Sequence, residues 1–245
     1  RLILSEVNLT LEAGEIIGVA GISGNGQREL AEALLGLRPL SAGRIIARDE
    51  TLSGAPAAAF LNAGIASIPQ NPREEGLVPG LTVLEHFAYD GLPRRETRMQ
   101  VDWAALSADF AAAPAVDELN VPAPGRFAAT LSGGNVQRMM VARALARRPR
   151  VIVASYPTQG LDIATTQRLM TLLLGLREHG CGVLLFSEDL SELYQVADVL
   201  VVVTHGRMLG PFDPAKIPAY DVAGLMVAGD GYRSNRLGHP LEAPA

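Results

Sequence analysis

The sequence predicts an α/β fold in which a mostly parallel β-sheet is flanked by helices. Short apolar runs of the kind buried in parallel sheets lie at residues 15–20, 64–68, 151–154, 182–186 and 199–203. Helical patterns separate these runs and lie at residues 29–35, 135–147, 163–178 and 189–196. Gly36 ends the first helix and the His179-Gly180 pair ends the third. Because strands that alternate with helices tend to pair in parallel, this order favours a sheet covered by helices.

The segment from about residue 72 to residue 130 has a different composition. It is rich in Pro and Ala and contains the single tryptophan, Trp103. Two modest helical patterns lie within it, at residues 81–89 and 102–112. We therefore expect an inserted helical subdomain, to which the helix after residue 134 also belongs.

The last part of the chain predicts one more helix and then a tail. A helical pattern covers residues 213–226, and from about Gly229 the sequence is rich in Gly, Pro and Arg. We expect a domain at residues 1–229 and a disordered tail at residues 230–245.

The composition sets limits on the class of protein. The chain has 245 residues, of which 48% are hydrophobic and 19% are charged, as in an ordinary globular core. A formal net charge of −5 argues against nucleic acid as a partner, because phosphate neutralisation needs clustered Lys and Arg. One cysteine, Cys181, cannot form an internal disulfide, and no apolar run is long enough to span a bilayer. We expect a cytoplasmic protein, and the missing initial Met indicates a segment of a longer chain.

A glycine-rich loop follows the first expected strand and opens a helix. Such a loop wraps a phosphate chain with backbone N–H groups at a helix N-terminus. In the full phosphate-loop pattern Lys would stand at position 27 and Ser or Thr at position 28, so Gln27 lacks the charge and Arg28 lacks the hydroxyl for Mg²⁺. The bare alternative is a tight turn that binds nothing. This phosphate loop consists of Gly21, Ile22, Ser23, Gly24, Asn25, Gly26, Gln27 and Arg28.

A second element follows the strand at residues 151–154. A strand that ends in Asp-Glu would hold Mg²⁺ with the first carboxylate and polarise the attacking water with the second. This chain has Ser155 and Tyr156 there instead. A tyrosine with a pKa near about 10 is a poor base at neutral pH, so no catalytic group is intact at these positions.

A third element opens the helix at residues 135–147. Residues 131–135 read Leu131, Ser132, Gly133, Gly134 and Asn135, and we call them the signature segment. Ser and two Gly residues at a helix start leave backbone N–H groups free to meet a phosphate. On its own the segment could equally be a polar helix cap.

The order of these motifs resembles that of the ATP-binding-cassette (ABC) ATPases over about residues 4–229. Besides the phosphate loop and the signature segment, the resemblance depends on Gln70 after a strand, on Gly160, Leu161 and Asp162 after Pro157-Thr158-Gln159, and on the Ser187-Glu188-Asp189 turn. The chain is most similar to the second, degenerate cassette of tandem importers for simple sugars or nucleosides. The resemblance implies a P-loop NTPase fold with a small antiparallel β region.

The resemblance also implies roles for these residues. Two cassettes in this family face each other, and the phosphate loop of one and the signature segment of the other enclose each ATP. The site with this chain's own phosphate loop is degenerate at Gln27, Ser155, Tyr156 and Glu188, the last of which stands where the family has a histidine. The signature segment would complete the working site of a partner cassette, where ATP and Mg²⁺ are bound. Further expected partners are membrane permease subunits, which place the chain on the cytoplasmic face of the membrane.

Two positions have simpler interpretations beside the implied ones. The resemblance makes Gln70 the loop glutamine that senses the γ-phosphate, but a Gln after Ile-Pro is also an ordinary turn residue. It makes Asp162 a residue that communicates between the two sites, and Asp162 is also a suitable N-cap for the helix that begins at Ile163. The alternative function is a nucleotide-sensing or structural dimerisation module without catalysis. A DNA-repair or translation protein of the family would need a coiled-coil insertion or basic arms, and neither is visible.

Overall fold

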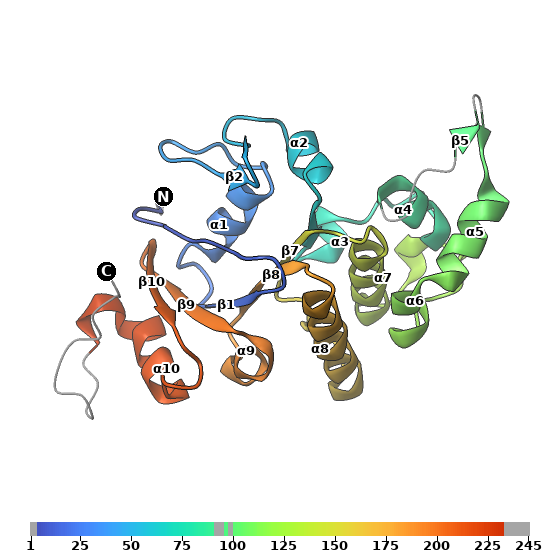
Figure 1. The fold of residues 1–245 in the computed structure, drawn as a ribbon. Coiled ribbons are helices and arrows are strands. Elements are labelled where there is room, and N and C mark those ends of the chain that lie inside the picture. Colours follow the sequence, from blue (N-terminus) through green and yellow to red (C-terminus); the bar gives the residue numbers. More distant parts are fainter. Residues whose placement is uncertain (1–3, 91–95, 98–99, 233–245) are drawn as a thin grey trace.

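The computed structural model describes residues 4–90, 96–97 and 100–232. Its centre is a six-stranded sheet in the order β10-β9-β1-β8-β7-β4, parallel throughout except where β10 pairs antiparallel with β9 (Figure 1). The strands are β1 (Ile16–Ala20), β4 (Ile65–Ile68), β7 (Val151–Ser155), β8 (Gly182–Ser187), β9 (Val199–Thr204) and β10 (Arg207–Phe212). Two small antiparallel pairs join β2 (Ile46–Ala47) to β3 (Glu50–Thr51) and β5 (Glu96–Thr97) to β6 (Gln100–Val101). The expected mostly parallel sheet and the small antiparallel region are confirmed.

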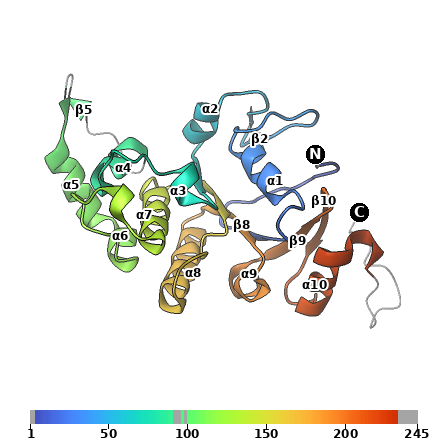
Figure 2. The same ribbon diagram turned by 180° about the vertical axis from the view of Figure 1, so that it is seen from behind.

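Helices follow most of the strands. They are α1 (Gln27–Leu34), α2 (Ala57–Asn62), α3 (Pro72–Glu75), α4 (Val83–Asp90), α5 (Trp103–Ala112), α6 (Pro114–Glu118), α7 (Gly133–Ala146), α8 (Ile163–Glu178), α9 (Leu190–Val196) and α10 (Ala219–Ala228). Short 3-10 turns lie at η1 (Ala128–Thr130) and η2 (Gly229–Gly231). In Figures 1 and 2, α1 and α2 lie on one side of the sheet and α8, α9 and α10 lie on the other.

Both faces of the sheet are buried, which explains why its strands are continuously apolar. Along β1, Ile16 belongs to the core cluster that α7 to α10 cover, and Ile17 belongs to the cluster beneath α1 and α2. The same alternation runs along β8, where Leu185 and Phe186 face opposite clusters. Cys181, immediately before β8, is buried, and its burial raises the pKa of the thiol to about 11.

Helices α4 to α7 gather beyond the β4 edge of the sheet (Figures 1 and 2). They pack on one another through side chains such as Phe87 of α4 and Phe110 of α5, whose ring centroids are 4.9 Å apart in an edge-to-face arrangement. This group contains most of the segment for which the composition indicated a helical subdomain. Arg73 of α3 attaches to this group, because its guanidinium donates to the carbonyl of Leu131, just before α7.

The C-terminal region differs from the expectation. The helix predicted at residues 213–226 begins only at Ala219, because residues 213–217 form a turn closed by the Ile217 N–H on the Asp213 carbonyl (3.0 Å), and Pro218 caps the helix. Strand β10 was not predicted, since its Gly210-Pro211 pair resembles a turn. Tyr232 still contacts the domain and donates to Asp221 (2.8 Å), and the rest of the predicted tail, residues 233–245, lies outside the described residues.

Candidate nucleotide site and signature segment

The phosphate loop connects the end of β1 to the start of α1. Gly24 (φ 91°) and Gly26 (φ 118°) adopt left-handed backbone conformations that an L side chain would strain. The Asn25 side chain accepts a hydrogen bond from the His205 N–H (3.1 Å), and its carbonyl accepts one from the Gly206 N–H (3.0 Å). The β9–β10 turn therefore holds the loop in shape from outside.

Gln27 turns back into the loop. Its side chain is 2% exposed, and its Nε2 donates to the Ile22 carbonyl at 2.9 Å. A Cβ atom on Gly21 would lie only 2.5 Å from the backbone carbonyl oxygen of Val203, so glycine is required there. The Oε1 atom of Gln27 is buried and has no hydrogen-bond partner within the described residues. The loop thus has a neutral amide, with its acceptor oxygen unpaired, where a phosphate site needs a cation.

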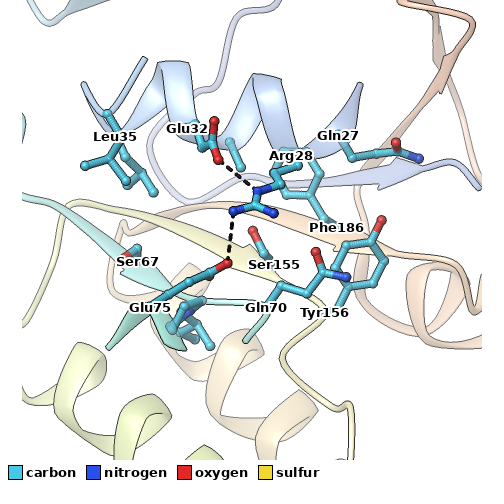
Figure 3. A pocket seen from close by; sticks show the side chains of 14 residues that line it. Gln27, Arg28, Glu32, Leu35, Ser67, Gln70, Glu75, Ser155, Tyr156 and Phe186 are labelled. Atoms are coloured by element: carbon cyan, nitrogen blue, oxygen red, sulfur yellow. Dashed lines mark hydrogen bonds and ion pairs between the residues drawn. The ribbon is translucent and has the colours of Figure 1, made fainter. Parts of the chain in front are cut away.

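Arg28 does not supply the missing charge, because its guanidinium points away from the loop. Its Nε donates to Glu32 one helical turn later (2.9 Å), and its outer nitrogen lies 3.8 Å from Glu75 of α3 (Figure 3). The hydrogen bond to Glu32 and the charges of Glu32 and Glu75 raise its pKa further. Arg28 therefore bridges α1 and α3.

A cleft of about 350 Å³ lies beside α1 and collects several of the predicted residues (Figure 3). Gln27, Arg28, Gln70, Ser155 and Tyr156 all line it. These residues, far apart in the sequence, are close together because β1, β7 and β4 end at the same edge of the sheet.

The cleft does not fit a metal ion. Mg²⁺ prefers carboxylate oxygens. Among the described residues, the carboxylates that line the cleft are those of Glu32 and Glu75, and both are paired with Arg28. Ser155 offers a neutral hydroxyl at the end of β7. In the described part of the chain, no three His, Cys, Asp or Glu side chains are placed to hold a metal ion.

Tyr156 is no better suited to act as a base. It has a left-handed backbone (φ 49°), unusual for an aromatic residue, and its N–H donates to the Phe186 carbonyl (2.9 Å). Burial and the negative charge of Glu188 raise the pKa of its hydroxyl to about 12. At neutral pH the hydroxyl therefore stays protonated and cannot take up a proton as a base would.

Glu188 is the predicted residue whose contact could not be anticipated. It follows β8, the neighbour of β1, and its carboxylate accepts a hydrogen bond from the Ser23 N–H of the phosphate loop at 2.6 Å. One of the loop's backbone donors is therefore bound to a carboxylate from the same chain.

The signature segment has a different environment. Ser132 is the N-cap of α7, and its Oγ accepts from the Asn135 N–H (3.4 Å). Gly133 and Gly134 are the first two residues of the helix, so their N–H groups have no intrahelical acceptor. A Cβ atom on Gly133 would meet nothing within 4 Å, whereas one on Gly134 would lie 3.2 Å from the Gly160 carbonyl.

Sequence reasoning missed the residue that joins this segment to the loop after β7. Gln137 is 3% exposed, and its Nε2 donates to the Pro157 carbonyl at 2.7 Å. A buried glutamine on an apolar helix face was the available signal, because such an amide needs a partner inside the fold. Gln137 fixes α7 against the segment that leads to residues 160–162.

Asp162 is the N-cap of α8, as the simpler interpretation predicted. Its carboxylate accepts from the N–H (2.9 Å) and the hydroxyl (2.8 Å) of Thr165. These bonds lower the pKa of Asp162, so the carboxylate is ionised at neutral pH. Within one chain, the signature segment and residues 160–162 lie together, and the cleft beside α1 is a separate place.

Comparison with known proteins agrees with these motifs. The ABC transporter family profile matches residues 4–159. The glucose import ATP-binding protein TsgD13 of Haloferax volcanii is 35% identical over 93% of this chain and 42% of its own length. The nucleoside import ATP-binding protein NupA of Lactococcus lactis is 31% identical over 91% of this chain and 45% of its own length. The chain thus spans less than half the length of these curated relatives.

Solved structures show the same fold. A dimeric ATP-binding cassette in a post-hydrolysis state, bound to ADP and phosphate, superimposes with a TM-score of 0.74 at 23% identity, covering 86% of this chain and 90% of that one. No helix within the described residues is both long and apolar enough to cross a membrane. From the family match, the extent of the similarity and the fold, the chain belongs to the ABC transporter family and is an ATP-binding cassette of the P-loop NTPase fold.

Proposed function

We propose that this cassette serves a membrane importer of simple sugars or nucleosides, and that its signature segment completes the ATP site of a second cassette. The observation that supports this most is the contrast between two helix starts. The start of α7 offers the Gly133 and Gly134 N–H groups to an incoming phosphate, whereas the start of α1 lacks the cation, the metal ligand and the base that hydrolysis needs.

The substrate class is supported by the relatives. Those named above act in glucose and nucleoside import by their names, and the ribose import ATP-binding protein RbsA 1 of Mesorhizobium japonicum is 35% identical over 84% of this chain. Because the relatives are more than twice as long as the matched region, the second cassette has room on the same parent polypeptide. The other partners would be permease subunits, with the cassette on the cytoplasmic face of the membrane.

In this arrangement the chain's own residues position phosphate without reacting with it. Ser132 and the α7 N-terminus would contact a phosphate chain held by the partner, with Mg²⁺ bound by the partner's carboxylates. When bound there, ATP would supply the phosphoryl group, and Mg²⁺ would neutralise part of the negative charge of its phosphates. The domain comprises residues 1–229, and α7 together with residues 72–130 forms the helical subdomain beside the sheet.

The test is ATP turnover of the reconstituted transporter. Gly133→Asp places a carboxylate where the partner's phosphate would lie, and an Asp in the first turn suits a helix, so folding is preserved. Turnover should fall by a factor of about 10² or more, as when one preorganised donor is lost. Gln27→Ala, on the degenerate side, should leave most turnover in place.

A matched control separates phosphate repulsion from the cost of a new side chain. Gly175→Asp adds the same side chain to α8, where a Cβ atom also meets nothing within 4 Å. If Gly133→Asp and Gly175→Asp are equally active, the segment only shapes the fold. The chain is then a structural dimerisation or nucleotide-sensing module.

A further inference from the structure

The contact between Glu188 and the phosphate loop places an anion against an anion-binding loop. The Glu188 carboxylate accepts a hydrogen bond from the Ser23 N–H at 2.6 Å, a short contact between a backbone donor and an acidic side chain. The loop therefore binds a negative group already, and that group belongs to the chain itself.

The fold holds Glu188 in this position. Strand β8 pairs in parallel with β1, and Ala20 lies opposite Ser187, so the residues that follow the two strands emerge side by side. The Ser187 hydroxyl accepts from the Asp189 N–H (3.0 Å) and donates to Glu192 (2.8 Å), which fixes the turn on which Glu188 lies. Little conformational entropy is lost when the carboxylate meets Ser23, because its backbone is already ordered.

The side chains at positions 27 and 28 do not offset the negative charge of Glu188 for an incoming nucleotide. The Gln27 amide is neutral, and its buried Oε1 has no hydrogen-bond partner among the described residues. Arg28 is directed to Glu32 and Glu75. A polyphosphate would therefore have to displace Glu188 from Ser23 and then remain beside its carboxylate.

We propose that Glu188 is the specificity-determining residue of this loop: as an internal anion it occupies the Ser23 N–H and excludes nucleotide phosphates. The inference rests on the proposed function only in treating the loop as this cassette's own nucleotide site. Beyond the missing lysine and metal ligands, the proposal names the Glu188 carboxylate as the group that keeps nucleotide phosphates out of the loop.

Hydrogen exchange of the loop tests this in the full-length protein with its partners. Exchange of peptides that contain residues 21–27 is followed by mass spectrometry while ATP is added in excess EDTA, so that hydrolysis does not consume it. Hydrogen bonds to charged groups contribute about 1.5–3 kcal/mol, so Glu188→Gln should lower the ATP concentration for half-protection about tenfold or more. Glu188→Ala, which also removes the acceptor, should lower it at least as far.

Glu29→Gln is the matched control. It removes the same charge from the first turn of α1, close to the loop, whereas the Ser23 N–H donates to Glu188. If Glu29→Gln changes the ATP concentration for half-protection by less than about twofold, the specific contact of Glu188 is supported. An equal change in Glu29→Gln and Glu188→Gln would show only a general charge effect and would overturn the proposal. No shift with Glu188→Gln also overturns it. The Gly133→Asp result on turnover does not depend on this outcome, so failure of the proposed function would be recognised separately.

Discussion

The chain contains two glycine-rich helix starts, and they differ in what their own side chains do. At α7, Ser132 caps the helix and leaves the next two amides open. At α1, the N-cap residue Gly26 has no side-chain cap, while Gln27 folds into the loop and Glu188 binds it from a neighbouring strand. Two helix ends with a similar backbone therefore differ: one has two open amides, and the other has a carboxylate of the same chain bound to its loop.

The comparison shows that glycine content alone does not identify a working phosphate site. Both segments have the glycines and the helix dipole that favour an anion. The two segments differ in the charged and polar side chains around them, and only the fold brings those side chains into contact. Three changes test this difference.

The largest effect is expected from Ser132, where the hydroxyl both caps α7 and faces the proposed phosphate. Ser132→Ala should lower ATP turnover of the assembled transporter by a factor of about 10². Ser132→Thr should retain most of the turnover. Ser132→Asp keeps a good N-cap but adds a negative charge, so it should be as inactive as Ser132→Ala while its melting temperature stays at the wild-type value. A fully active Ser132→Asp protein would mean that the hydroxyl is only a cap.

A smaller effect is expected from the support of the same segment. Gln137→Leu leaves the Pro157 carbonyl without its partner, which should cost about 1–3 kcal/mol of stability, measured by chemical denaturation. Displacement of α7 should also reduce turnover about tenfold. Gln167→Leu on the exposed face of α8 is the control and should change neither quantity. Wild-type turnover in Gln137→Leu would show that the contact does not position the segment.

The smallest effect is expected at Tyr156, in the cleft beside α1. Tyr156→Phe should change turnover at pH 7 by less than about twofold, since no proton transfer passes through the hydroxyl. The raised pKa also has a stability consequence. The neutral hydroxyl contributes its full stability below pH 10 and loses it as the pH rises through about 12, because the unfolded tyrosine ionises first. Between pH 9 and 12 the melting temperature should therefore fall less steeply with pH for Tyr156→Phe than for the wild-type protein. An identical dependence of the melting temperature on pH in both proteins would contradict this.

Most of the fold was predictable because its strands are buried on both faces. The five predicted runs correspond to β1, β4, β7, β8 and β9, each with a boundary error of at most one residue. Within the six-stranded sheet, the strand without a predicted run is β10, which lies at the edge and contains Gly210 and Pro211, so its composition resembled a turn. The late start of α10 has a similar cause, since a capping Pro218 interrupts what appeared to be one helical pattern.

The candidate site was predictable as a set of positions but not as a set of contacts. Motif spacing identified Gln27, Ser155, Tyr156 and Glu188 as departures from the family pattern. It could not show that Glu188 reaches Ser23, because that contact depends on β8 lying beside β1. Nor could it show that Arg28 leaves the loop for Glu75, which follows from the position of α3 against α1.

The anchoring of Asn25 by the β9–β10 turn has a consequence for how such a domain can change over many generations. Two hydrogen bonds from His205 and Gly206 hold Asn25 of the loop, in addition to the bond that Gln27 donates to the Ile22 carbonyl. Substitution at position 27 can therefore remove the chemistry of the loop while the fold remains intact. A cassette built in this way can lose catalysis at its own phosphate loop over evolution and still fold as the structural partner of a second cassette.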